Sequence, residues 1–521
     1  METRNVYAGA AALVAIAAMA VPLVLIMGDG GEGFQDTSGV VFVGDRPVAD
    51  FYLDSCSGCH GASREGGTGP ALVPERLTET PEFYAQTIHD GRPGTVMPPW
   101  GTALTNAEID SLVAYILSEP EEGSLEWTIE DMVASLSVIT PEEELATEPT
   151  HGGDLDDLLL VTERESRAIA VIDGPTHELL GTIPASYRAH GYTFSPTNPR
   201  WAYNMGRDGW VFKIDLYTLL PVRQIRIGID SRSLAISDDG RYLIAGNYVP
   251  GTLAILDAET LEPLKLFNTD GTNPEGEPVI ARVATILDVS PDLVGPYFLV
   301  AMKESGEVWR IDWSDPAFPV EIVSDVGHVL HDGFLSPDNS TFYIASQEDN
   351  WMAAIDVASL EVIEKISTGD IPHPGSGATW EVDGVVYGAT THAGEGLVSI
   401  WNLDTNEVVA SIPTAGPGLF IRSHEASPFV WADAMFAAEP HSITVFDKEP
   451  PFGVIGVIED GVRTLHPEFS ADGTLVYISD WDGNAVRVYD AVTLELVDEI
   501  TDIPAPTGIF STERRSETLG H

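Results

Sequence analysis

Short apolar runs separated by polar turns fill the chain from about residue 155 to residue 510. The repeated unit is an apolar run, an Asp-Gly or Asn-Gly turn, and a second apolar run that ends in Ile-Asp or a similar pair. Instances lie at residues 210–215, 253–257, 308–312, 352–356, 398–402 and 486–490. The first four of these end at aspartates spaced 42, 55 and 44 residues apart. Because such intervals equal one blade, the pattern predicts an all-β propeller of about eight blades, with a sandwich as the alternative.

A different periodicity precedes this region. Residues 106–119 place apolar side chains, from Ile109 to Leu117, at helical spacing, which predicts an amphipathic helix. Upstream stands Cys56-Ser57-Gly58-Cys59-His60, which contains the chain's only two cysteines. Two thiols can attach a haem covalently, and the histidine can bind its iron. Half a zinc site or a thioredoxin-like redox motif fits less well, since neither a second ligand pair nor a βαβ pattern is near.

Met97, in Val96-Met97-Pro98-Pro99-Trp100, is the candidate for the sixth iron ligand, because a thioether opposite a histidine is usual where iron only transfers electrons. The segment from about residue 46 to residue 120 resembles class I cytochrome c domains. The sequence thus predicts a small all-α cytochrome c domain with haem c, followed by the all-β eight-bladed propeller.

The N-terminal segment bears on the compartment. Residues 7–27 carry no charge and are long enough to cross a bilayer, and Arg4 precedes them. We expect a transmembrane anchor that leaves the protein on the extracytoplasmic face of the membrane. A cleaved signal peptide is the alternative, because Ala18-Met19-Ala20 resembles a cleavage site. The expected organisation is an anchor at 1–30, a linker at 31–45, the cytochrome domain at 46–120, an acidic linker with one short helix at 121–154, and the propeller at 155–521.

The charge balance limits the partners. The chain has 26 basic and 81 acidic residues, a formal net charge of -55. Nucleic acid is excluded as a partner, since nothing here could neutralise phosphates. Acid spread along the whole chain is typical of adaptation to high salt, where charge repulsion is screened. Steering of a basic redox partner is the alternative reading.

Three histidines occupy similar places in the repeat. They are His190, His331 and His373, and the last two are 42 residues apart, about one blade. We therefore expect His331 and His373 side by side at one mouth of the channel, as proton donors, with His190 as a possible iron ligand opposite. The plain alternative is that each histidine only hydrogen-bonds a turn.

Several motifs carry a family resemblance. They are 206–216, Ser231-Arg232-Ser233, Leu261-Glu262-Pro263-Leu264-Lys265, Ala281-Arg282-Val283-Ala284, Met302-Lys303-Glu304-Ser305-Gly306, Leu330-His331-Asp332-Gly333, Pro372-His373-Pro374-Gly375 and Pro506-Thr507-Gly508. In this order they resemble the successive motifs of the cytochrome cd1 nitrite reductases. The resemblance implies a d1 haem in the propeller, with His190 as its proximal ligand and His331 and His373 as the distal pair over the substrate.

The resemblance also implies an activity, the one-electron reduction of nitrite to nitric oxide. Electrons would come from a small donor, a cytochrome c or a cupredoxin, and the enzyme could be a homodimer. Because haem d1 is a polycarboxylate, its pocket should contain guanidinium groups. We assign Arg207, Arg232 and Arg282 to the haem carboxylates. Tyr248 is a weaker candidate for the pocket.

The chain departs from the family at several positions. Glu277-Pro278-Val279-Ile280-Ala281 precedes Arg282 where the family resembles His-Pro-Glu-Pro-Arg, and Thr193 and Ser376 replace family arginines. Two other functions stay open. One is the related dehydrogenase that completes haem d1 in its biosynthesis, which would need no paired nitrite-facing histidines. The other is a membrane-tethered electron carrier whose propeller is only a docking scaffold.

Overall fold

The computed structural model describes residues 42–513, apart from 44–45, 62–63, 65–68, 75, 78, 93–96, 98, 102–103, 119–125 and 165. The expected membrane anchor, residues 7–27, lies outside this range. Among the helices that the structure describes, none is long and apolar enough to span a bilayer.

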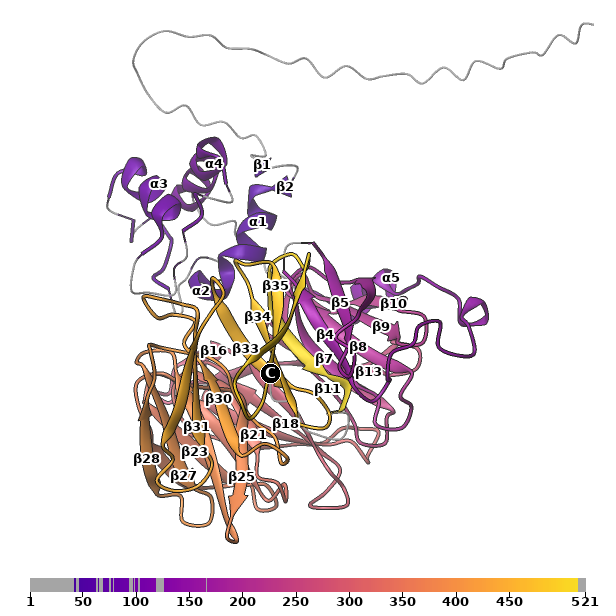
Figure 1. Ribbon diagram of the computed structural model, residues 1–521. Helices are drawn as coiled ribbons and strands as arrows, with labels where there is room; N and C mark the ends of the chain where they lie inside the picture. The colour runs from indigo at the N-terminus through magenta and orange to yellow at the C-terminus, as the bar shows by residue number, and fades with distance from the viewer. Residues whose placement is uncertain are drawn as a thin grey trace, which may run out of the picture. The chain divides into compact units, whose positions relative to one another are not determined.

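The predicted cytochrome domain consists of short helices and a small ribbon. The elements are β1 (Phe42–Val43), β2 (Arg46–Pro47), α1 (Val48–Ser55), α2 (Ser57–His60), α3 (Pro81–Asp90) and α4 (Asn106–Leu117) (Figure 1). The capping box of Thr105 and Glu108 starts α4, and its apolar stripe is buried. The amphipathic helix predicted at residues 106–119 is therefore confirmed.

Eight antiparallel sheets form the blades of a propeller, as predicted. The first four, from the inner strand outward, are β37 (Pro506–Ser511), β4 (Leu158–Glu163), β5 (Ala168–Asp173), β6 (Leu179–Pro184); β7 (Ala189–Phe194), β8 (Trp201–Gly206), β9 (Trp210–Asp215), β10 (Leu220–Arg226), β3 (Ser137–Val138); β11 (Asp230–Ile236), β12 (Tyr242–Val249), β13 (Thr252–Asp257), β14 (Pro263–Asn268); β17 (Val283–Val289), β18 (Tyr297–Met302), β19 (Glu307–Asp312), β20 (Val320–Val323).

The other four blades follow in chain order. They are β21 (Leu330–Leu335), β22 (Thr341–Ser346), β23 (Trp351–Asp356), β24 (Glu361–Ser367); β25 (Pro372–Val382), β26 (Val385–His392), β27 (Leu397–Asn402), β28 (Val408–Pro413); β29 (Ile421–Ser423), β30 (Phe429–Asp433), β31 (Ser442–Asp447), β32 (Val454–Glu459); β33 (Thr464–Phe469), β34 (Leu475–Asp480), β35 (Ala485–Asp490), β36 (Leu496–Thr501). A separate ribbon, β15 (Asp270–Thr272) with β16 (Pro278–Ile280), branches between the third and fourth blades. Buried apolar side chains of neighbouring blades share one core cluster, so the core is a ring between the sheets.

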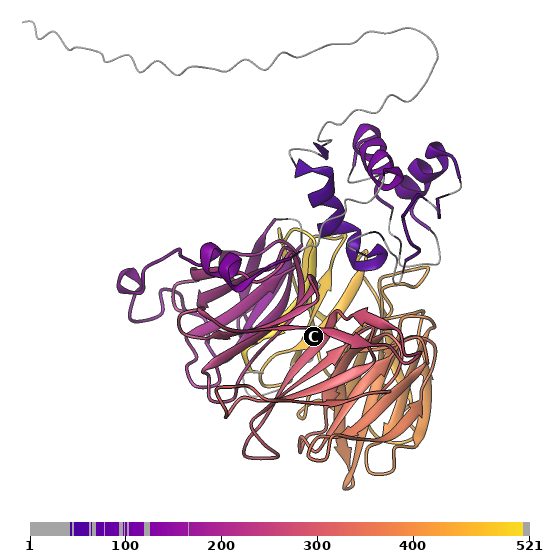
Figure 2. The same cartoon turned by 180° about the vertical axis from the view of Figure 1, so that it is seen from behind.

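The C-terminal strand closes the ring. β37 pairs antiparallel with β4, with Phe510 opposite Leu160. Figures 1 and 2 show the yellow C-terminal strands beside the purple strands near residue 160. The first blade thus combines both ends of the propeller segment, which removes the open edges that an unclosed array would leave.

The repeated Ile-Asp ending has a local cause. The aspartate that ends the third strand of a blade caps the turn after it, because its carboxylate accepts backbone N–H groups of that turn. Asp257 accepts from Glu259 and Thr260, and Asp490 accepts from Val492 and Thr493, at 2.7–3.0 Å. Such Asx turns explain why the repeat is visible in the sequence.

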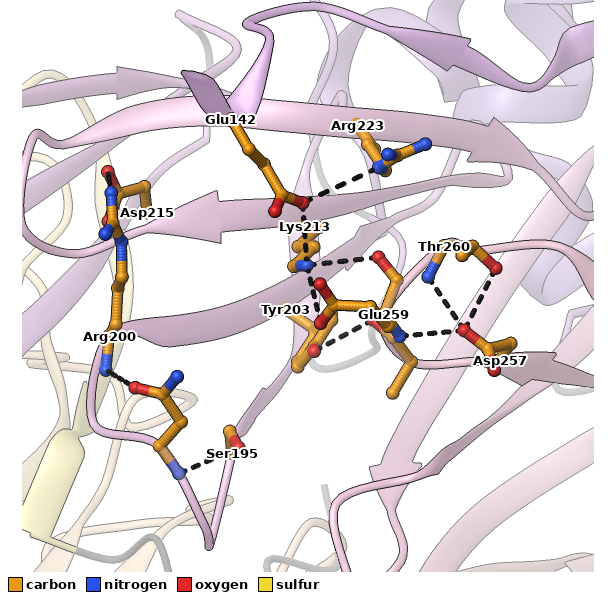
Figure 3. Close-up of polar contacts among 12 residues, drawn as sticks. Glu142, Ser195, Arg200, Tyr203, Lys213, Asp215, Arg223, Asp257, Glu259 and Thr260 are labelled. Atoms are coloured by element: carbon orange, nitrogen blue, oxygen red, sulfur yellow. Dashed lines mark hydrogen bonds and ion pairs between the residues drawn. The ribbon is translucent and has the colours of Figure 1, made fainter. Parts of the chain in front are cut away.

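The predicted acidic linker, 121–154, is partly built into the propeller. It contains α5 (Ile129–Ser135), the short helix expected there, then β3 as a fifth strand on the second blade, then η1 (Glu142–Glu144). Figure 3 shows Lys213 of β9 between Glu142 and Glu259, with Nζ–carboxylate distances of 3.2 and 3.0 Å. Lys213 is fully buried, so the ammonium depends on these partners.

We expect Lys213→Met to lower the free energy of unfolding by about 2 kcal/mol. The variant loses the ion pairs of the buried ammonium with Glu142 and Glu259 but keeps most of the apolar contacts of the side chain. Denaturant unfolding followed by circular dichroism measures this. Lys365→Met, on exposed β24, is the control and should change stability by less than about 0.5 kcal/mol. An equal loss in both variants would show that the buried pairing contributes nothing.

Candidate functional site

The predicted site residues come together at the start of the inner strands. His190, His331 and His373 are each the second residue of their strand, in β7, β21 and β25. Arg232 is the third residue of β11, and Arg282 immediately precedes β17. Inner strands of consecutive blades lie side by side, so these positions face one mouth of the channel.

His331 and His373 are adjacent, as predicted from their spacing. Their ring centroids are 4.7 Å apart at an interplanar angle of 45°. The side chains are only 13% and 8% exposed, respectively. The two imidazole rings are thus in contact distance and mostly buried.

A carboxylate that the sequence analysis gave no role lies between them. Asp332 is fully buried, with Oδ1 2.8 Å from Nδ1 of His331 and Oδ2 3.3 Å from Nδ1 of His373. The Arg232 guanidinium reaches the same Oδ1 at 2.8 Å. One potential metal-ligand atom from each of His331, Asp332 and His373 lies within 4.8 Å of the others. The neighbouring guanidinium disfavours a cation there. Two imidazoles around one carboxylate can accept and hold protons.

The histidine pair differs electrostatically from what the sequence predicted. Burial lowers the pKa of His331 well below its usual 6.5, and the positive charges of Arg232 and Lys303 lower it further, against the opposing effect of Asp332. His331 is therefore neutral at neutral pH. The sequence analysis expected His331 to be a proton donor, whereas its lowered pKa favours the proton-accepting form.

Tyr248 marks the most positive part of the site. Its ring lies 4.6 Å from the guanidinium carbon of Arg207 and 5.0 Å from that of Arg282. Burial by itself would raise the pKa of the phenol, but Arg232, Lys303 and the two flanking arginines together bring it below its usual value. A phenol that is easier to ionise despite burial reports a strongly positive potential.

Each predicted arginine also has a carboxylate partner within the chain, which the sequence analysis did not assign. The pairs are Arg207 Nη2 with Asp230 at 3.0 Å, Arg232 Nη2 with Asp332 at 2.8 Å and Arg282 Nη2 with Glu304 at 2.5 Å. Burial raises the pKa of Asp230 to about 6, with Arg207 and Arg282 opposing the rise. Buried Lys303 adds a fourth cationic group against these three carboxylates. An excess of positive charge fits a group that carries several carboxylates.

The C-x-x-C-H segment fits a covalent haem. Cys56 and Cys59 lie at the start and within α2, and His60 ends it. The Nδ1 of His60 donates to the Pro70 carbonyl oxygen at 2.8 Å, which leaves Nε2 as the ligand atom. Burial lowers the pKa of His60, so the ring is neutral, as an iron ligand must be. A Cβ on Gly69 would lie 2.7 Å from this ring, so only glycine fits there.

Two predicted iron ligands stay predictions. Met97 lies in the segment after α3, where its carbonyl oxygen accepts the N–H of Arg92 at 3.1 Å. His190 is partly exposed on β7. The structure places both in the expected parts of the fold.

A line of rings continues from the histidine pair, and the sequence analysis did not single it out. His373 lies 6.2 Å from Phe420, Phe420 lies 4.3 Å from His466, and His466 lies 5.2 Å from Phe510. His466 is buried on β33 and accepts the N–H of Ile509 at Nδ1. Its position at the start of an inner strand was the available signal, in Thr464-Leu465-His466-Pro467.

A cavity of about 780 Å³ lies at the other ends of the inner strands. Its walls include Tyr192, Phe334, Asp288 and Glu468. Thr193 and Ser376, which replace family arginines, also line it. The two departures therefore change the polarity of this cavity.

Comparisons with known proteins cover both parts of the chain. Residues 153–515 match the cytochrome D1 heme domain, and residues 45–116 match the family of cbb3-type cytochrome c oxidase subunit III. A dihydro-heme d1 dehydrogenase of Pseudomonas aeruginosa is 33% identical over 485 residues, which are 90% of this chain and 94% of that protein. A nitrite reductase of Stutzerimonas stutzeri is 30% identical over 523 residues, 88% of this chain and 91% of the relative.

A solved structure agrees with the first relative. It is the dihydro-heme d1 dehydrogenase NirN in complex with DHE, with a TM-score of 0.72 and 32% identity over 89% of this chain and 98% of that one. Haem c and haem d1 binding and an oxidoreductase activity are thereby confirmed. The predicted reduction of nitrite is contradicted, because both the 33% identical relative and the matching structure are dehydrogenases. The histidine pair, which had favoured nitrite, does not separate the two activities.

Proposed function

This chain belongs to the cytochrome D1 heme domain family, and we propose that it oxidises dihydro-haem d1 to haem d1. The similarity to the dehydrogenase extends over 90% of the chain and includes both the cytochrome and propeller parts. This similarity is the observation that carries the proposal, and the pair His331 and His373 is compatible with it, because both Nδ1 atoms face acceptors and burial lowers the pKa of His331. A neutral imidazole accepts protons, as a dehydrogenase requires.

The reaction balances with the parts that the chain provides. The substrate loses two hydrogens as two protons and two electrons. Haem c, when bound by Cys56, Cys59 and His60, supplies a one-electron acceptor. The electrons then leave one at a time to a small redox protein, a cytochrome c or a cupredoxin, so that this partner is an acceptor and not the donor expected from the sequence.

The propeller residues bind the substrate and remove its protons. Arg207, Arg282 and Lys303 surround Tyr248 with the positive potential that substrate carboxylates need. His331 and His373 take protons at Nε2 on the distal side. His190, on the opposite inner strand, is the proposed ligand of the substrate's iron.

The lowered pKa of His331 sets the pH dependence. A base works only when deprotonated, so kcat should rise with pH through this pKa and then stay level. Because the pKa lies well below 6.5, we expect the plateau to be reached before pH 6.5. Stopped-flow reduction of the c haem between pH 4.5 and pH 8 measures it. A rate still rising through pH 7 would contradict a neutral histidine base.

The test of function uses the purified holoprotein with its c haem oxidised. Addition of dihydro-haem d1 should reduce two c haems for each substrate molecule oxidised. It should also yield the red absorption of haem d1. Nitrite with dithionite-reduced protein should release no nitric oxide over repeated turnovers. No change of the dihydro-haem d1 spectrum in the presence of excess oxidised acceptor would overturn the proposal.

We also propose that residues 7–27 anchor the enzyme on the extracytoplasmic face of the membrane. The uncharged run and the preceding Arg4 support this, and c-type haem attachment is compatible with export. Fractionation of the native host tests it. The full-length protein should remain in the membrane fraction after a salt wash, and a variant without residues 1–30 should not. A mature N-terminus after residue 20 would indicate a cleaved signal peptide.

A further inference from the structure

The carboxylate between the two histidines has a definite partner at each of its oxygen atoms. Oδ1 of Asp332 accepts from Arg232 and faces Nδ1 of His331, and Oδ2 faces Nδ1 of His373. The guanidinium 2.8 Å away compensates the charge of this buried carboxylate. An ionised carboxylate can only accept hydrogen bonds.

The tautomers of both rings follow from these contacts. Nδ1 of His373 lies 3.0 Å from the carbonyl oxygen of Leu419, which is also only an acceptor, so this nitrogen carries the proton. Nδ1 of His331 carries its proton for the same reason, at 2.8 Å from Asp332. In the neutral rings both Nε2 atoms are therefore unprotonated, and both can act as bases.

We propose that Asp332 is the positioning residue that, together with the Leu419 carbonyl oxygen at His373, fixes both distal histidines in the Nδ1–H tautomer and so directs two proton-accepting Nε2 atoms at one substrate. The proposal rests on the proposed dehydrogenase function for its role in turnover. A second step of the same arrangement concerns charge. When either ring takes a proton, the new imidazolium lies against Asp332, which stabilises it.

Other charged groups around the pair fit this arrangement. Arg232 of β11 and Lys303 after β18 raise the local positive potential, and Tyr248 of β12 is hydrogen-bonded to Arg232. Without the carboxylate, these cations would oppose protonation of either ring. One carboxylate thus offsets their effect while it also sets the tautomers.

The replacement Asp332→Asn separates these effects. An amide of the same shape has one acceptor oxygen and one NH2 group, so it can accept from only one Nδ1 and presents a donor to the other. Because Arg232 donates to the Oδ1 position, the NH2 group faces Nδ1 of His373, and this ring must give up either its Nδ1 proton or its present orientation. We expect kcat for dihydro-haem d1 oxidation to fall by at least about 100-fold, with KM changed less than threefold.

Asp215→Asn is the matched control. Asp215 is also fully buried and also paired with an arginine, Arg200, at 2.8 Å, but it lies on β9 (Figure 3). This variant should lose a comparable amount of stability and keep its kcat and pH profile. If Asp215→Asn lowers kcat as much as Asp332→Asn does, the effect is structural and the proposal fails.

A spectroscopic readout tests positioning without turnover. In the reduced holoprotein with 15N-labelled histidine, His331 and His373 are assigned from the signals lost in His331→Ala and His373→Ala. Both should show protonated Nδ1 and unprotonated Nε2, and Asp332→Asn should change the ring-nitrogen signals of His373. Unprotonated Nδ1 in the wild type, or spectra and pH profile unchanged in Asp332→Asn, would overturn the proposal. The expected tautomers in a protein that does not oxidise dihydro-haem d1 would support positioning and reject only the proposed reaction.

Discussion

Removal of both distal histidines, in His331→Ala/His373→Ala, is expected to lower kcat for dihydro-haem d1 oxidation by about 10³-fold, because two general bases are lost together. In each single variant kcat should fall by about 10²-fold, since the rings lie 4.7 Å apart and the remaining histidine can still accept protons from the substrate. Stopped-flow reduction of the c haem by the substrate measures this step. Reduction of the same haem by ascorbate should be unchanged.

His392→Ala is the control for burial. His392 is fully buried on β26, its Nε2 is 3.0 Å from Ser399 Oγ, and burial lowers its pKa to about 4. His392 lies opposite Pro372 in the sheet, but its ring hydrogen-bonds Ser399 of β27, so its loss creates a similar cavity beside the site and leaves the contacts of the histidine pair in place. Turnover should therefore remain near that of the wild type. Retained turnover in the double variant would mean that protons leave by another route, and the proposed role of the pair would be rejected.

The propeller could be predicted because each blade repeats its local chemistry. Aspartates such as Asp257 and Asp490 cap the same turn in different blades, so the sequence shows the spacing directly. The closing strand, β37, was not visible, because its partner β4 is more than 300 residues away and pairing depends on the completed ring. The pairing of the acidic linker with the second blade was also not visible, since β3 is only two residues long and is a strand only through its pairing with β10.

The grouping of the candidate site residues could be predicted from the sequence, but their protonation could not. Blade spacing brought His331 and His373 together, which the structure confirms. Their protonation could not be derived from spacing, because it depends on the burial of His331 and on Arg232 and Lys303, which come from other blades. The same reason hid Asp332: it stands next to His331 in the sequence, but its contacts with Arg232 and His373 are long-range.

The second large effect concerns substrate binding. We expect Arg207→Gln/Arg282→Gln to raise the Kd for dihydro-haem d1 by at least about 100-fold, because each of the two guanidinium–carboxylate contacts contributes roughly 1.5–3 kcal/mol. The change in kcat at saturating substrate should be small, since neither arginine contacts the histidine pair in the described contacts. Fluorescence or absorbance titration of the reduced protein gives the Kd. The pKa of Tyr248 should rise in the same variant, because the two cations flanking its ring are gone.

Loss of an arginine also leaves Asp230 and Glu304 without their partners, so weaker binding must be separated from weaker folding. Arg422→Gln provides this comparison, because Arg422 is buried and paired with Glu468 at 3.0 Å, outside the cluster around Tyr248. It should destabilise the fold and leave Kd unchanged. Wild-type affinity should fall with added salt, and the double variant should show a weaker dependence. An unchanged Kd in the double variant would show that the positive potential at Tyr248 serves only the chain's own carboxylates.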